Sequence, residues 1–174
     1  MFGANWGTTP DERTLAFPCD IVLPNAHSVY HRGISVRAPA AVVFRWLCQL
    51  RVAPYSYDLL DNFGRRSPRT LTPGLDDLAV GQRVMTIFEI VAFERDRSLT
   101  LRLRRRSRIF GEIAISYVIV PSSASSVRLL ARIHVRYPGL PVGPVARLVL
   151  PFGDLVMMRK QLMTLRDLAE HTSG

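Results

Sequence analysis

The sequence predicts a single α+β domain in which an antiparallel β-meander packs against an amphipathic helix near the C-terminal end. With 174 residues, of which 48% are apolar and 21% charged, the chain is long enough to bury a core and fold as one domain. Between residues 83 and 137, segments rich in β-branched and aromatic residues alternate with short polar turns, as in an antiparallel meander. From 153 to 170, apolar residues recur at steps of three and four, which indicates a helix with one apolar face.

The N-terminal part is expected to wrap the surface of the domain. The sequence TPDE at residues 9 to 12 forms a capping box, which predicts a short helix beginning at Pro10. Turn-forming residues follow up to residue 27. The predicted organisation is therefore an N-terminal wrapping segment, a main domain and a C-terminal tail, at residues 1–27, 28–170 and 171–174.

A strand, a helix and an irregular excursion precede the meander. Residues 28 to 36 have strand character, and a largely apolar helix is predicted from Pro39 to Leu50. Residues 51 to 82 mix prolines, glycines and acidic residues, and we expect a short helix near 56 to 62 followed by a long loop. Loops of this length inside a compact domain are often functional.

Four strands and a final helix complete the predicted domain. In two of the strands, alternation places leucines on one face and arginines on the other. The final helix is predicted from about Gly153 to Glu170, with Pro151 bending it away from a preceding helical turn at 142 to 150. The predicted strands are RVMTIFEIVAFE (83–94), LTLRL (99–103), IFGEIAISYVIV (109–120) and VRLLARIHVRY (127–137).

Several stretches resemble the START and SRPBCC superfamily, which includes polyketide cyclase-like and birch-pollen-allergen-type proteins. SVRAPAAVVFRWL is similar to the family's entry from a strand into its first helix, and VAFERDRSLTL is similar to its strand turn. ISYVIVP with SVRLLARIHV resembles its closing hairpin. The resemblance covers residues 28 to 170. It implies a helix-grip fold, a curved antiparallel β-sheet wrapped around a long C-terminal α-helix, with an internal cavity.

Such a fold implies binding of a small hydrophobic or amphipathic ligand, such as a lipid, a quinone or a polyketide-like molecule, between sheet and helix. Tyr117 shares a predicted strand face with isoleucines, and methionines such as Met158 adapt to irregular apolar shapes, although both patterns also fit plain core packing. The predicted ligand-lining residues are Tyr55, Tyr57, Phe63, Ile87, Ile115, Tyr117, Ile133, Leu155, Met158 and Leu162.

Two charged residues are candidates for the polar part of that cavity. Simple alternation along the strands points both Arg32 and Glu89 inward among apolar neighbours. An unpaired buried charge is costly, which leaves three interpretations. The two residues pair with each other, they bind the polar head of a ligand, or the faces of these strands are the reverse of those assigned.

An enzymatic role is the first alternative, and the sequence leaves it open. The stretch YSYDLLDN offers Tyr55, Tyr57 and Asp58 as acid–base candidates for a polyketide cyclase or dehydratase-like reaction, although acids on a helix surface are usually only solvated. Neither the two cysteines nor the four histidines have the spacing of a metal or redox motif. We therefore predict no metal site and no cofactor.

An interaction module built on basic charge is the second alternative. The net charge is +9, and the run RLRRRSR at 102 to 108 holds five arginines. Alternation places Arg102, Arg104, Arg132 and Arg136 on the outer, solvated sheet face, as a solubility surface or a weak contact for an anionic membrane or acidic carrier protein. Interleaved stacking aromatics are missing, so specific nucleic-acid binding is not predicted. The sequence predicts a cytoplasmic protein and does not indicate its oligomeric state.

Overall fold

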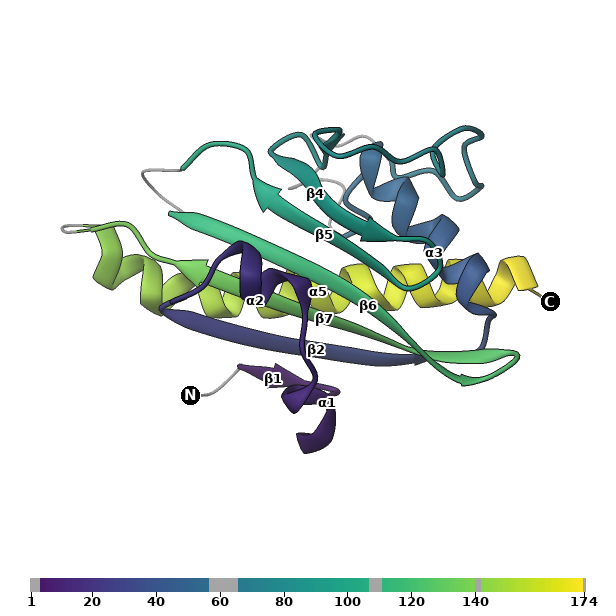
Figure 1. The fold of residues 1–174 in the computed structure, drawn as a ribbon, viewed down its shortest axis with the longest axis horizontal. Helices are drawn as coiled ribbons and strands as arrows, with labels where there is room; N and C mark the ends of the chain where they lie inside the picture. Colours follow the sequence, from purple (N-terminus) through teal and green to yellow (C-terminus); the bar gives the residue numbers. More distant parts are fainter. Residues whose placement is uncertain (1–3, 57–65, 107–110, 140–141, 174) are drawn as a thin grey trace.

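A seven-stranded sheet with a long helix along one face forms the molecule (Figure 1). The computed structural model describes residues 4–56, 66–106, 111–139 and 142–173, with side chains given outside 142–154. The strands are β1 (Asn5–Trp6), β2 (Ser28–Val36), β3 (Arg83–Val84), β4 (Phe88–Glu94), β5 (Ser98–Leu103), β6 (Glu112–Ser123) and β7 (Ser126–Arg136). The helices of the described ranges are α1 (Pro10–Thr14), α2 (Pro18–Val22), α3 (Ala40–Cys48), the 3-10 turn η1 (Gln49–Arg51) and α5 (Val142–Ser173).

The sheet confirms the predicted α+β helix-grip architecture. Its strand order is β1-β2-β7-β6-β5-β4-β3, with parallel pairing between β1 and β2 and antiparallel pairing between the other neighbours. The meander therefore pairs in chain order from β3 to β7, and β2 closes against β7. Since β2 precedes α3 and β7 precedes α5, the closing pair brings both helices to the sheet.

Alternation along the strands defines an inner face, which packs on α5, and an outer face. Tyr117 of β6 lies on the inner face because its hydroxyl contacts Met158 and Gln161 of α5. Its cross-strand partners Leu99 and Ala131 are buried on the same face. The leucines of β5 are therefore directed into the core as predicted, because a strand with one apolar face can bury only that face.

Helix α3 covers the same face near the C-terminal end of α5. Its central residues are almost all buried, as the apolar run predicts, and the chain continues into η1 close to the predicted end at Leu50. The indole Nε1 of Trp46 donates to Thr172 Oγ1 at 3.0 Å, and Glu170 Oε1 accepts the backbone N–H of Arg37 at 2.8 Å. These bonds tie the end of α5 to the β2–α3 connection.

The N-terminal segment packs on the outer face of the sheet. The predicted capping box is confirmed, because Thr9 Oγ1 accepts from the Glu12 N–H and Glu12 accepts from the Thr9 N–H. Two further elements were not predicted, strand β1 and helix α2, which starts with Pro18 at its first position. Around α2, a small apolar cluster of Phe17, Cys19, Leu23, Ala114 and Leu130 covers the outer face.

Two element boundaries differ from the predictions. The expected strand over 83–94 is divided into β3 and β4, because Met85 and Thr86 have left-handed φ values of 44° and 66° and turn the chain between them. Ile87 is consequently half exposed. The final helix also begins earlier than the predicted Gly153, since α5 runs from Val142 and includes the helical turn expected at 142 to 150. An internal proline removes one helical hydrogen bond and bends the helix, which does not oblige it to end.

The outer face is only in part the solvated surface that the sequence predicted. Arg132 is only 6% exposed and lies under the N-terminal segment, with its guanidinium carbon 4.1 Å from the centre of the Phe17 ring. Arg136 pairs with Glu112 at 2.8 Å. The prediction failed because alternation identifies a face and gives no information on what covers it. Of the four predicted outer-face arginines, Arg102 and Arg104 are exposed.

Most of the short helix expected near 56 to 62 lies outside the described residues. No helix of the described ranges combines the length and the apolar character needed to span a bilayer.

Candidate functional site

A buried polar node lies between the sheet and α5. The Tyr117 hydroxyl donates to Gln161 Oε1 at 2.6 Å, and Gln161 Nε2 donates to the carbonyl oxygen of Pro54 at 2.6 Å. Two methionine sulfurs border it, Met158 Sδ at 3.9 Å from the Tyr117 hydroxyl and Met85 Sδ at 3.4 Å from Gln161 Nε2. We call these five residues the glutamine node. It joins β6, α5, the chain after η1 and the β3–β4 turn.

Strained backbone surrounds the glutamine node. Tyr55 and Met85 have left-handed φ values of 55° and 44°, which residues with a side chain adopt at a cost. The Tyr55 ring is buried and meets Trp46 edge-on, with ring centres 6.0 Å apart. The Met85 N–H donates to the Leu50 carbonyl oxygen at 3.0 Å, which holds the β3–β4 turn against η1. Two separate segments thus adopt unfavourable conformations at the same place.

A second polar group lies on the inner face near the sheet edge formed by β1. Arg32 is fully buried, as the inward alternation predicts, and its Nη1 donates to the carbonyl oxygens of Ala4 and His31 at 2.8 and 2.9 Å. Its guanidinium also lies over the Tyr30 ring at 5.5 Å, and the Tyr30 and Tyr137 hydroxyls bond to each other. A cation and two phenols therefore interrupt an otherwise apolar surface.

Glu89 does not meet Arg32. It is the cross-strand partner of Arg102 on the outer face, and their side chains form an ion pair at 3.1 Å. Its neighbours Phe88 and Ile90 are the buried residues of β4. Of the three interpretations, reversed faces holds for Glu89, since the buried residues Val84, Phe88 and Ile90 all lie one position out of step with the predicted inward set.

The structure brings part of the predicted ligand-lining set together. Tyr55, Ile115, Tyr117, Ile133, Met158 and Leu162 are buried in the main core, and Leu155 is partly buried. Ile87 is exposed, and Tyr57, Asp58 and Phe63 lie outside the described residues. Gln161 was missed, although the sequence signalled it as a polar residue on the apolar stripe shared by Met158 and Leu165. No feature of the sequence indicated the Pro54 carbonyl, since tertiary packing alone brings it to Gln161.

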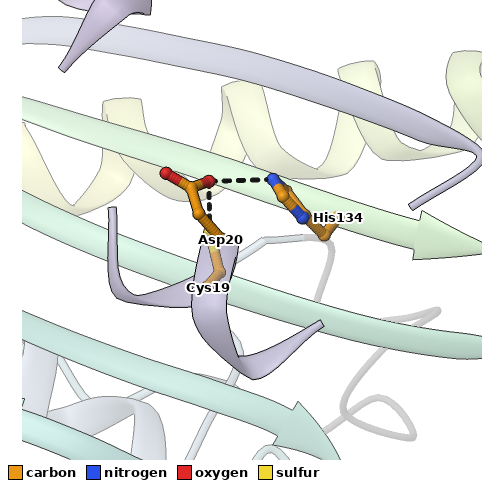
Figure 2. A group of neighbouring side chains, drawn as sticks. All are labelled: Cys19, Asp20 and His134. Atoms are coloured by element: carbon orange, nitrogen blue, oxygen red, sulfur yellow. Dashed lines mark hydrogen bonds and ion pairs between the residues drawn. The ribbon is translucent and has the colours of Figure 1, made fainter. Parts of the chain in front are cut away.

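The sequence also did not predict a cluster of Cys19, Asp20 and His134 on the outer face (Figure 2). Asp20 Oδ1 lies 3.0 Å from His134 Nε2, and His134 Nδ1 lies 3.0 Å from the Leu23 carbonyl oxygen. A carbonyl only accepts, so Nδ1 carries the hydrogen of this bond. The ligand-type atoms of the three residues lie within 4.8 Å of one another.

The bonding within this cluster is that of a clamp rather than a metal centre. Arg132 Nη1 lies 3.1 and 2.8 Å from the two Asp20 oxygens, and the Phe17 N–H donates to Asp20 at 2.8 Å. A cation would have to displace that guanidinium. Burial raises the pKa of Cys19 to about 11, which disfavours the thiolate that a metal requires. The cluster instead fixes α2 to β7.

Comparison with known proteins agrees with this architecture. No protein-family model and no curated protein matches the sequence. Among solved structures, the Zhui aromatase/cyclase from Streptomyces sp. R1128 is similar with a TM-score of 0.53 and 14% identity, over 82% of this chain and 93% of that one. A START superfamily protein from Mycobacterium smegmatis has a TM-score of 0.52 and 12% identity, over 83% and 98%. The chain therefore has the helix-grip fold that these solved structures share.

Proposed function

We propose that the protein binds a small hydrophobic or amphipathic molecule, such as a lipid, a quinone or a polyketide-like compound, between the inner face of the sheet and α5. The observation that carries the proposal is the glutamine node. Ligand sites are mostly apolar, with a few fixed polar groups that orient the ligand. Here one amide and one phenol stand among leucine, isoleucine and methionine side chains.

Two properties of the node favour a ligand over plain core packing. Burying amide and phenol groups costs free energy unless each is hydrogen-bonded, and an all-apolar core avoids that cost. Left-handed conformations at Tyr55 and Met85 add a further cost, and such strain is found preferentially at ligand clamps and active sites. The methionines Met85 and Met158 supply thioethers that adapt to different ligand shapes.

Native mass spectrometry and organic extraction of the purified protein test the proposal, followed by thermal shifts with lipids, quinones and aromatic polyketides. Gln161→Leu should weaken the binding of any ligand found by about tenfold, the loss of one buried hydrogen bond. Thr164→Ala is the matched control, since Thr164 is buried on the same helix and its hydroxyl donates to the Lys160 carbonyl oxygen within that helix. Failure of every compound to bind, or equal binding by both variants, would contradict the proposal.

A cyclase-like activity on the bound molecule is the second candidate. Two aromatase/cyclases are among the structural neighbours, the Zhui enzyme and the di-domain BexL protein at a TM-score of 0.50. Tyr55 is the sequence-derived acid–base candidate that the structure buries beside the node. Incubation with an aromatic polyketide substrate distinguishes the candidates. A cyclised product formed by wild type and lost in Tyr55→Phe supports an enzyme, and binding with unchanged substrate supports a carrier.

A further inference from the structure

A cleft of about 480 Å³ lies on the outer face, on the opposite side of the sheet from the glutamine node. It is bordered by the connection after α2, by the end of β5 and by the facing ends of β6 and β7. This volume is in the range of small-molecule sites. Its basic residues are Arg102, Arg104, Arg106 and Arg136, and its apolar residues include Leu23, Pro24, Leu103 and Ile113.

Positive charge dominates this outer cleft. Its lining contains four guanidiniums and one carboxylate, that of Glu112. Glu112 is already engaged by Arg136 at 2.8 Å and lies 3.7 Å from Arg106. Arg104 is exposed, and no carboxylate of the described residues lies within ion-pair distance of it. Arg102 pairs with Glu89 at 3.1 Å, so the guanidinium that an anion would find without a counter-charge from the described acids is that of Arg104.

The apolar wall of the cleft is held in a fixed position. The Leu23 carbonyl accepts from His134 Nδ1 at 3.0 Å, and the Pro24 carbonyl accepts from Arg136 Nη2 at 2.5 Å. The clamp between Asp20 and His134 (Figure 2) is thus continuous with the wall, because His134 also bonds to Leu23. A site that is built before its ligand arrives loses less conformational entropy on binding. The wall contributes leucine and proline surface opposite the arginines.

We propose that the outer cleft binds a phosphate monoester with an apolar body. Guanidinium groups match the oxygens of phosphate with paired hydrogen bonds. Several guanidiniums together therefore favour a doubly charged phosphate over a singly charged carboxylate. The phosphate lies against Arg104 and Arg106, and the body lies against Leu23 and Pro24. The ester is a free metabolite or the headgroup of a lipid, which share this chemistry. Nothing in the proposal depends on the inner-face site.

Phenyl phosphate is the probe, measured by isothermal titration calorimetry beside inorganic phosphate and benzoate. We expect phenyl phosphate to bind more tightly than either, with a Kd of about 1 mM or lower. Arg104→Ala combined with Arg106→Ala should weaken it by about tenfold or more, since two charged hydrogen-bond donors are lost. The control Arg45→Ala with Arg69→Ala removes the same charge from exposed positions that do not line the cleft, and should change the Kd less than about twofold.

Each result decides the proposal. Equal weakening in both double variants would mean that net charge alone attracts the anion. Binding that survives Arg104→Ala with Arg106→Ala would place the anion elsewhere. Either result overturns the proposal, as does a failure of phenyl phosphate to bind. Benzoate binding as tight as phenyl phosphate would overturn the preference for phosphate.

Co-sedimentation with phosphatidylcholine vesicles, with and without phosphatidic acid, then distinguishes a lipid headgroup from a free phosphate ester. Phosphatidic-acid-dependent binding lost in the cleft variant identifies a lipid headgroup, and its absence identifies a free ester.

Discussion

His31 lies on the outer face of β2, opposite Arg132 of β7. Burial is the main cause that lowers its pKa to about 4, and the nearby cations Arg132, Arg13, Arg32 and His134 lower it further. The folded protein thus keeps this imidazole neutral at a pH where the unfolded chain already binds a proton. Folding stability from this group is complete above about pH 6.5 and is lost as the pH falls towards 4.

His31→Gln tests that linkage. Urea unfolding at pH 7.5 and at pH 4.5 gives the loss of unfolding free energy on acidification for each protein. The loss should be smaller in the variant, because glutamine cannot take up the proton that favours the unfolded chain. Comparing the two losses removes any change that the substitution makes at both pH values. Identical losses would mean that His31 titrates alike in the folded and unfolded states.

Alanine substitutions at two glycines with similar φ values distinguish the cost of backbone strain from the cost of a steric clash. Gly7 and Gly74 have φ values of 69° and 76°. A Cβ at Gly7 would lie 2.0 Å from the Gly33 carbonyl oxygen, whereas a Cβ at Gly74 would have no described residue other than its chain neighbours within 4 Å. Gly74→Ala should cost about 1 kcal/mol from strain alone. Gly7→Ala should cost about 3 kcal/mol, because β1 must also move away from β2. Equal losses in chemical denaturation would contradict this.

At the scale of elements, the attachment of α2 to the sheet depends on a charged pair that is mostly buried. Asp20 accepts from Arg132, whose side chain is 7% exposed, while the Asp20 side chain is 34% exposed. Removing the carboxylate leaves a guanidinium buried without its counter-charge. That loss, rather than the energy of the pair itself, makes such positions sensitive to substitution.

Asp20→Asn should therefore lower the free energy of unfolding by about 2 to 3 kcal/mol, somewhat below the cost for a fully buried pair. Asp77→Asn removes an equal charge from an exposed position and should change it by less than about 0.5 kcal/mol. Adding Arg132→Met to Asp20→Asn should restore part of the loss, because the unpaired charge is then gone. A double variant as unstable as the sum of the two single variants would refute the explanation.

At the scale of the whole molecule, apolar layers lie on both faces of the sheet and differ in size. The main cluster between the sheet, α3 and α5 contains Cys48, and the small cluster under α2 contains Cys19. Burial raises the pKa values of these thiols to about 12 and 11. Both are therefore protonated and unreactive while the protein is folded. A thiol reagent reports when each layer opens.

The N-terminal layer should open before the rest of the molecule, because fewer buried apolar residues hold it. Single-thiol variants, Cys48→Ala and Cys19→Ala, can be treated with Ellman's reagent at urea concentrations below the unfolding midpoint. Cys19 should react faster than Cys48 under these conditions, and both should react at once when fully unfolded. Equal rates below the midpoint would instead indicate that both layers unfold together.

Features that depend on near neighbours in the chain were predictable. The capping box at Thr9 and Glu12 is a contact over three residues, and alternation in β5 and β7 follows from the pleat of a strand. Tyr117 and Met158 of the site followed from the same patterns. The division at Met85 was not predictable, because a left-handed conformation at a methionine has no local sequence signal.

The sequence by itself determined the order of elements, the two faces of the sheet and the apolar stripe of α5, because these depend on spacing along the chain. Tertiary structure decided what covers each face. The alternation of β7 is the same whether Arg132 is exposed or buried, and its partners Asp20 and the Arg13 carbonyl, 112 and 119 positions away, make its burial possible. Gln161 likewise acquires its role from Tyr117 and Pro54. A buried polar group is stable only with its partner, and the fold, rather than the local pattern, supplies that partner.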